Sequence, residues 1–175
     1  IALLTAVNIE GSPQTFGGDE FFGYIDENAF ASAFNVPRQT LSPILDKGNG
    51  LYELRWRITQ QGMAYLHVFH ARRGGLRANF YSDSFLQVYD LSQIHAHVNF
   101  TWGIGSVSGS MNDYTSICWK GLLKPPSSGE YILSVHADDH VRLFIDGLLR
   151  IDAWDDVSPP INQSYTIQLQ ANVFY

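Results

Sequence analysis

Two neighbouring segments of the chain alternate between polar and apolar residues. In residues 50–59, Glu53 and Arg55 alternate with Leu54 and Trp56, and residues 63–70 show the same period of two. Successive side chains of a β-strand point to opposite faces, so this period predicts two strands that each have one wet face. The short polar segment between them favours pairing as a β-hairpin.

A second group of alternating segments lies near the end of the chain. Residues 129–136 and 141–145 predict two strands that are separated by a polar tip at residues 137–140. Asp146 and Gly147 then predict a two-residue turn of the type that needs positive φ angles, and residues 148–152 predict the next strand. Together these segments predict a β-meander with an acidic tip.

The composition of the whole chain is that of an all-β protein. Aromatic residues make up 14% of the 175 residues, and they stand with Val, Ile and Thr in short stretches broken by Gly, Pro, Asn and Asp. Only residues 26–34 favour a short helix. The polar, flexible segment 72–75 predicts a domain border. We therefore expect two tandem antiparallel β-sandwich modules, residues 1–74 and 75–175.

The charge balance argues against several classes of partner. The chain has 11 Lys and Arg against 17 Asp and Glu, and its net charge of −6 provides no basic surface for nucleic-acid phosphates. No apolar run reaches the roughly 20 residues that a membrane-spanning helix needs, so we expect no membrane insertion. Because the chain starts at Ile1 without a Met, we expect it to be a piece of a longer protein.

The first half resembles a filamin-type immunoglobulin-like repeat. The resemblance rests on residues 46–54 and 59–68, where a strand of the pattern D-x-G-x-G-x-Y is followed by one of the pattern G-x-Y-x-(L/I)-x-V. It implies a small antiparallel sandwich that serves as a structural spacer.

The second half resembles the carbohydrate-associated β-sandwich named after anthrax protective antigen, the PA-fourteen family. Seven blocks follow the order of that family, namely residues 75–81, 98–103, 119–123, 126–132, 137–139, 141–147 and 151–154. Members occur in bacterial toxins, glycosidases, yeast adhesins and surface glycoproteins, so the resemblance implies a fold without naming one function. The closing strands and a second ligand-binding loop of that family would follow Tyr175, and we expect that this chain ends before them.

The same resemblance points to one metal site. In adhesin members the pair that matches Asp138 and Asp139 coordinates Ca²⁺ through a cis peptide bond. Hard cations favour clustered carboxylates together with carbonyl and water oxygens, so Asp138 and Asp139 are predicted ligands of Ca²⁺. The alternative is that both residues only turn the chain. The position after the pair is usually Gly in the family, and His140 in its place is expected to alter the turn.

The next loop offers a candidate contact for a sugar. Trp154 beside Asp155 has the chemistry to stack on a sugar face, although a Trp more often packs to hold its loop in place. The sequence has no Gly-x-Ser-x-Gly, no phosphate-binding glycine loop and no His-Glu-x-x-His. Adjacent carboxylates also diverge too far to flank one glycosidic bond. We therefore predict no catalytic residue and no enzymatic activity.

Three further residues bear on the setting of the protein. Asn99 and Asn162 begin Asn-x-Ser/Thr acceptors for N-glycosylation, which agrees with an extracellular glycoprotein. The single cysteine, Cys118, stands between Ile117 and Trp119, and this favours an inert thiol buried in the core.

These features favour a non-enzymatic structural or adhesive module of a larger extracellular glycoprotein, on the cell surface or in a secreted fibre. The alternative is a Ca²⁺-dependent lectin whose sugar lies over Asp138 and Asp139, and a third interpretation is an accessory module of a secreted glycosidase. The expected partners are other copies of the chain, neighbouring modules and glycans. In one hypothesis residues 1–7 complete the second sandwich of another copy and so build a fibre.

Overall fold

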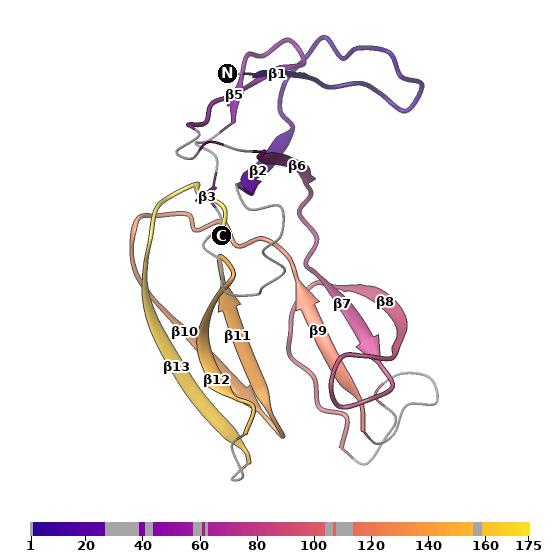
Figure 1. Cartoon of the computed structure of the whole chain (residues 1–175), viewed down its shortest axis with the longest axis vertical. Helices are drawn as coiled ribbons and strands as arrows, with labels where there is room; N and C mark the ends of the chain where they lie inside the picture. The colour runs from indigo at the N-terminus through magenta and orange to yellow at the C-terminus, as the bar shows by residue number, and fades with distance from the viewer. Residues whose placement is uncertain are drawn as a thin grey trace. The chain divides into compact units, whose positions relative to one another are not determined.

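The chain folds into β-strands throughout the part that the structure describes. The structure is a computed structural model, and it describes residues 2–26, 39–40, 44–57, 61, 63–103, 107, 114–155 and 159–175. Within these ranges it has thirteen strands and no helix, which confirms the all-β prediction (Figure 1). The predicted helix at residues 26–34 lies outside these ranges except for Asp26, which ends a strand. None of the described segments forms a helix that would span a lipid bilayer.

The chain divides into two compact units. The first unit joins Ile1–Ala71 to Lys124–Tyr175, and the second unit is Arg72–Leu123. The predicted modules, residues 1–74 and 75–175, stay a prediction.

The N-terminal part of the first unit contains two three-stranded antiparallel sheets, of the orders β1-β5-β4 and β3-β2-β6. Their strands are β1 (Ala2–Thr5), β2 (Glu20–Asp26), β3 (Gln39–Thr40), β4 (Leu45–Asp46), β5 (Leu51–Leu54) and β6 (Tyr65–Ala71). Ile25 and Leu54 are buried at 3% and 2% exposure, and Val68 packs against them. Removal of these apolar side chains from water stabilises this part of the unit.

The predicted hairpin between residues 50–59 and 63–70 is wrong. β5 lies in the centre of its sheet, with β1 along one edge and β4 along the other. Because both hydrogen-bonding edges of β5 are filled, β6 pairs with β2 instead. The alternation of residues correctly located strands in both segments but did not identify their partners.

The turn between β4 and β5 depends on the carboxylate of Asp46 and on two glycines of the turn, Gly48 and Gly50. The backbone N–H groups of Gly18 and Gly48 each donate to a carboxylate oxygen of Asp46 at 2.7 Å. Gly50 has a φ angle of 76°, and a Cβ atom at this position would collide with the carbonyl oxygen of Gln14. Glycine alone lacks the Cβ atom, so it alone fits here without strain.

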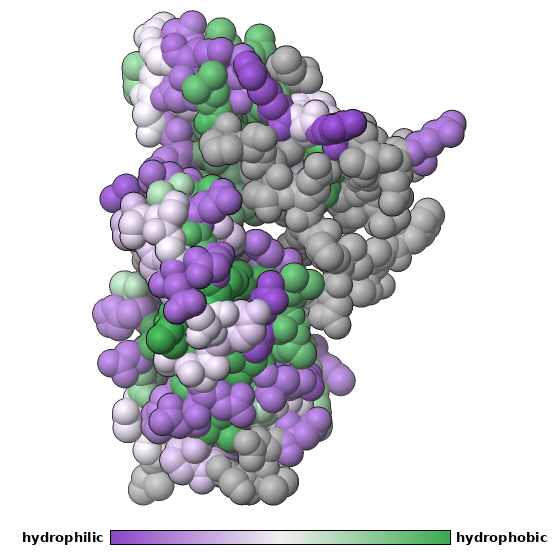
Figure 2. Space-filling model, turned by 90° about the vertical axis from the view of Figure 1, so that its left-hand side faces the viewer, coloured by the Kyte–Doolittle hydropathy of each residue, from purple (hydrophilic) through white to green (hydrophobic). Residues whose placement is uncertain are grey.

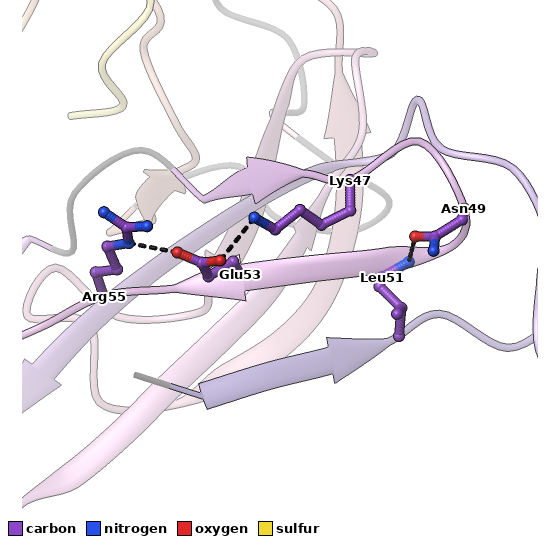
Figure 3. A network of polar contacts seen from close by, with 5 residues as sticks. All are labelled: Lys47, Asn49, Leu51, Glu53 and Arg55. Carbon is purple, nitrogen blue, oxygen red and sulfur yellow. Dashed lines mark hydrogen bonds and ion pairs between the residues drawn. The ribbon is translucent and has the colours of Figure 1, made fainter.

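A small ionic network lies on the half-buried face of β5, where Glu53 is covered by the more exposed Lys47 and Arg55 (Figure 3). The Glu53 carboxylate contacts Nζ of Lys47 at 2.7 Å and also contacts Nε of Arg55. Lys47, followed by Arg55, lowers the pKa of Glu53. At the start of the strand, the N–H of Leu51 donates to Oδ1 of Asn49 at 3.3 Å. Water screens exposed ion pairs, so this sheet depends mainly on its buried face.

The N-terminal strand β1 pairs within its own chain. Ala2 lies opposite Leu54 and Thr5 lies opposite Leu51, and the N–H of Ala6 extends the pairing by donating to the carbonyl oxygen of Gly50 at 2.8 Å. β1 is the outer strand in the order β1-β5-β4, so this pairing fills one of its two hydrogen-bonding edges. The pairing of residues 2–5 in their own sheet argues against the hypothesis that residues 1–7 complete a sandwich in another copy, and contact between copies stays a prediction.

The second unit is built on one sheet of the order β8-β7-β9. Its strands are β7 (Leu76–Tyr81), β8 (Tyr89–His95) and β9 (Ser116–Lys120). Ala78 and Phe80 are buried at 0% and 2% exposure, and Ile117 and Trp119 pack against them. Cys118 stands between these two residues, so it faces the other side of β9, where it is free and half-buried. The prediction of a thiol buried in this core is wrong.

The connection between β7 and β8 is organised around the carboxylate of Asp83. It accepts a hydrogen bond from the N–H of Phe85 at 2.6 Å, from the N–H of Gln87 at 3.0 Å and from the N–H of Val88. Donors of this kind stabilise the charged form. They lower the pKa of Asp83, and the Val88 N–H has the largest effect. The hydroxyl of Ser116 donates to the main-chain oxygen of Asp83 at 2.6 Å and so ties the loop to β9.

The C-terminal part of the first unit contains two antiparallel pairs of strands. Its strands are β10 (Gly129–Ala137), β11 (Val141–Ile145), β12 (Leu148–Ala153) and β13 (Ile161–Leu169). β11 and β12 form a hairpin, in which Asp146 and Gly147 have φ angles of 52° and 74°. The predicted two-residue turn with positive φ angles is therefore confirmed.

The predicted β-meander is wrong in one pairing, because β10 pairs with β13 and not with β11. β13 matches the full nine-residue length of β10, and its end residues Ile161 and Leu169 are buried at 3% and 2% exposure. Burial of alternate residues fixes this register, since a slip of one residue would turn them toward water. On the side of the molecule that Figure 2 shows, hydrophobic residues are visible between hydrophilic ones.

The first prediction concerns the core of the N-terminal sheets. We expect Leu54→Ala to lower the free energy of unfolding by about 2–5 kcal/mol, because it leaves a cavity next to Ile25 and Trp56. Urea unfolding followed by tryptophan fluorescence measures the change. Leu3→Ala is the control, because Leu3 lies in the same sheet and is 63% exposed. Equal unfolding midpoints for the two variants would contradict this assignment of the core.

The second prediction concerns the dependence of stability on pH. A carboxyl group whose pKa is lowered by folding stabilises the protein fully above the unfolded-state pKa of about 3.9, and this contribution is lost as the pH falls through the folded-state value. We therefore expect Asp83→Asn to melt at a lower temperature than the unmutated chain at pH 7, and the two melting temperatures to converge in acid.

Melting curves of both proteins between neutral pH and about pH 2 test this expectation. Asp90→Asn is the matched control, because Asp90 is an exposed residue on β8. A difference between Asp83→Asn and the unmutated chain that stays constant with pH would show that the charge of Asp83 does not hold the loop.

Candidate functional site

A rim of polar side chains lies where the two C-terminal strand pairs end. The ladder of β10 and β13 ends at Ala137 opposite Ile161, and the hairpin of β11 and β12 ends at Val141 opposite Ala153. The tip between β10 and β11 and the loop after β12 both leave from these ends. The rings of His140 in the tip and Trp154 in the loop contact each other at a centroid distance of 6.3 Å. We call Asp138, Asp139, His140, Trp154 and Asp155 the acidic rim.

Asp138 and Asp139 are exposed at the tip of the acidic rim. Their peptide bond is cis, as is the bond between Pro159 and Pro160. Among the described residues neither carboxylate has a hydrogen-bond or ion-pair partner. Across the same residues no group of three or more His, Cys, Asp or Glu side chains is placed to hold a metal ion. Calcium at this pair stays a prediction, and backbone carbonyl and water oxygens would have to complete its coordination.

Trp154 is held by residues of the neighbouring strands. The guanidinium of Arg142 lies 5.1 Å from the centroid of the Trp154 ring, and Nε of Arg142 contacts Oδ1 of Asp152 at 2.8 Å. The backbone N–H of Trp154 donates to the same Oδ1 at 3.3 Å. These contacts lower the pKa of Asp152, with Arg142 as the largest cause. Because Arg142 covers one face of the indole, a stacked sugar would have to use the other face.

Asp155 follows Trp154 and is exposed. It lies in the same loop as the indole, but among the described residues its carboxylate forms no cluster with Asp138 and Asp139 that could hold a metal ion. The structure thus brings Trp154 to the tip through His140, and it does not gather the three acids of the acidic rim into one cluster.

The two glycosylation acceptors are both accessible. Asn99 is exposed in the segment after β8, and Asn162 is exposed on β13, opposite His136. Accessibility permits N-glycosylation but does not establish it, and N-glycan at Asn99 or Asn162 stays a prediction.

A row of aromatic side chains on β2 and β6 was not predicted from the sequence. Tyr24 lies opposite His67, and Phe22 lies opposite Phe69. The rings of Tyr24 and His67 are 4.6 Å apart at an interplanar angle of 20°, and those of Phe22 and Phe69 are 6.3 Å apart at 28°. Within each strand the aromatic residues of the row are two positions apart, and this spacing is visible in the sequence. Only the pairing of β2 with β6 brings the two strands' rings together.

Comparison with known proteins identifies the C-terminal part of the chain. Residues 72–175 match the PA14 domain, which is the protective-antigen-type domain that the sequence resembles. Among curated proteins, the chain is 33% identical over 102 residues to the anti-sigma-I factor RsgI3 of Acetivibrio thermocellus. The matched part is 58% of this chain and 16% of that protein.

Two solved structures are also similar. One is an anti-sigma factor domain-containing protein with 32% sequence identity and a TM-score of 0.55, where the match covers 58% of this chain and 35% of the other. Another is an anti-sigma factor domain-containing protein from Clostridium clariflavum with a TM-score of 0.55, where the match covers 92% of this chain and 69% of the other. At 20% identity the second likeness shows the fold alone. The match over residues 72–175 shows that the chain belongs to the PA14 domain family.

Proposed function

We propose that the chain is a ligand-recognition module in the extracellular part of a larger sensory protein, and that it recognises carbohydrate with the help of Ca²⁺. The observation that carries this proposal is the acidic pair Asp138 and Asp139, which is exposed and without a described partner at the tip of a PA14 domain. The relatives named as anti-sigma factors support a regulatory protein as the parent. The chain spans 16% of the length of its curated relative, so most of such a parent would lie outside it.

The proposed binding mode follows from the side chains of the acidic rim. Asp138 and Asp139 supply carboxylate oxygens, which are the donors that Ca²⁺ prefers. When it is bound, Ca²⁺ supplies a positive charge to which two neighbouring hydroxyl groups of a sugar can bind. We expect the indole face of Trp154 opposite Arg142 to serve as a wall for the apolar face of the same sugar, next to the ring of His140.

The proposal includes no catalysis. The two carboxylates are adjacent in the chain, so they do not flank a bond as the acid and base of a glycosidase must. Binding to nucleic acid is disfavoured by the net charge of −6. Glycans are therefore the expected partners, and the extracellular space or the cell surface is the expected location.

The structural and adhesive role has less support. The fibre hypothesis relied on a donated N-terminal strand, and β1 is already paired with β5 in its own chain. An accessory module of a secreted glycosidase remains the competing interpretation, since a PA14 domain by itself does not fix the function of its parent protein. The sequence of the parent protein on either side of this chain distinguishes them, because a neighbouring hydrolase domain would favour the glycosidase.

The third prediction tests the calcium site. A ligand that binds only the folded state stabilises it, by about 2.7 kcal/mol at a free concentration of 100 times Kd. We expect the melting temperature of the chain to be higher in Ca²⁺ than in chelator, and Asp139→Asn to remove most of this difference because it takes away one carboxylate. Glu130→Gln is the matched control, since it neutralises an exposed carboxylate on β10 away from the tip.

A glycan array probed in Ca²⁺ and in chelator tests the ligand class. The proposal predicts that sugar binding at the acidic rim is lost in chelator and in Asp139→Asn, and retained in Glu130→Gln. Identical melting curves with and without Ca²⁺ for the unmutated chain would contradict the calcium site and would mean that Asp138 and Asp139 only turn the chain. Loss of binding in both variants alike would point to a general effect of charge.

A further inference from the structure

The aromatic row on β2 and β6 has a definite ring geometry. Tyr24 and His67 are 4.6 Å apart at 20°, a distance at which two rings overlap face to face. His67 and Phe69 are 6.4 Å apart at only 4°. Residues two apart on a strand are separated by about 6.6 Å, so these two rings are neighbours on one face of β6 and their planes are nearly parallel.

The rings of Phe69 and, to a smaller extent, His67 are accessible to solvent. In the order β3-β2-β6 of the described strands, β6 is the edge strand, so the ring faces that point away from Tyr24 point away from the sheet. Phe69 is 47% exposed, and Tyr65 of the same strand face is 50% exposed. We call His67, Phe69 and Tyr65 the aromatic platform.

The other end of the row is closed and electrically neutral. Phe174 packs edge-on against Phe22 at a centroid distance of 6.1 Å. Nζ of Lys124 lies 5.1 Å from the centre of the Phe174 ring and contacts Oε1 of Glu20 at 2.7 Å. Because these two charges are paired with each other, the row does not call for a charged ligand.

The size of the platform selects among possible occupants. An aromatic side chain offers about 150–250 Å² in all, so three side chains at half exposure or less offer about 300 Å². A stable protein–protein interface buries about 800 Å² on each partner. The platform is too small to hold a second copy of the chain or another folded protein by itself, and a thin ligand fits it better.

The chemistry of the platform fits a neutral sugar chain. A pyranose ring has one apolar face of C–H groups that packs on a flat aromatic face, and hydroxyl groups at its edge that need hydrogen-bond partners. The phenol of Tyr65 and the imidazole of His67 supply both donors and acceptors within the platform. Aromatic faces with hydrogen-bonding groups beside them are what such a ligand requires.

We infer that the aromatic platform is a subsite for a neutral polysaccharide, separate from the acidic rim and independent of Ca²⁺. The inference takes its ligand class partly from the proposed function and adds a second contact for it outside residues 72–175. The two ideas fail separately, because one requires Ca²⁺ at Asp138 and Asp139 and the other does not.

Affinity electrophoresis of the full chain in gels that contain neutral polysaccharides provides the test. The panel is xyloglucan, mixed-linkage β-glucan, arabinoxylan and galactomannan, and all gels contain chelator so that any Ca²⁺ site is empty. We expect at least one polysaccharide to retard the unmutated chain, and Phe69→Ala to weaken that binding about tenfold or more, as loss of an exposed aromatic contact in a binding site does.

Leu66→Ala is the matched control. Leu66 is 41% exposed on the same strand, and its side chain lies on the opposite face of β6 from Phe69. We expect this variant to keep the affinity of the unmutated chain. In the unmutated protein, the ring signals of His67 in an NMR titration with a fragment of the bound polysaccharide should shift, and this measurement does not depend on the folding of any variant.

The outcomes separate the two sites. One outcome supports the platform whether or not the calcium site exists: polysaccharide binds in chelator, Phe69→Ala weakens that binding, and Asp139→Asn leaves it unchanged. No retardation in chelator by any member of the panel overturns the inference, as does equal weakening by Phe69→Ala and Leu66→Ala. Self-association that Phe69→Ala abolishes in the absence of polysaccharide, measured by sedimentation velocity, also overturns it and assigns the platform to contact between copies.

Discussion

The ladder between β10 and β13 is the constraint on which the acidic rim depends. The two strands pair over nine residues and end at Ala137 opposite Ile161, so Asp138 is the first residue free of the ladder. Burial of Ile161 and Leu169 at the two ends of β13 fixes this register, because a shift of one residue would expose both. The register that the buried face fixes therefore determines where Asp138 and Asp139 leave the ladder.

A comparable constraint shapes the N-terminal sheets. β5 has β1 on one edge and β4 on the other, and therefore leaves β6 to pair with β2. The face-to-face contact of Tyr24 with His67 exists only in that pairing. The aromatic row therefore forms because both edges of β5 are occupied, which leaves β6 to pair with β2. The aromatic residues alone do not fix this pairing.

Local features of the fold were predictable from the sequence, and long-range ones were not. Alternation located strands in residues 51–54, 65–71 and 129–137, and the Asp146–Gly147 turn followed from the preference of these residues for positive φ angles. The partners of β5 and β10 were predicted wrongly, because alternation is a property of one strand whereas pairing is a competition among all strand edges. The acidic pair was found through the family resemblance, whereas the aromatic row required the register of β2 with β6, which no single segment contains.

The end of the ladder at Ala137 and Ile161 also separates sequence changes in the loops from sequence changes in the paired strands. Loops that begin beyond the last bonded pair can lengthen, shorten or exchange residues while the strands keep their register. Arg142 is an exception, because it belongs to β11 and yet lies over Trp154. Apart from such links, ligand preference at this end of the strands can diversify through its loops at little cost to folding, so a single scaffold can present different recognition surfaces.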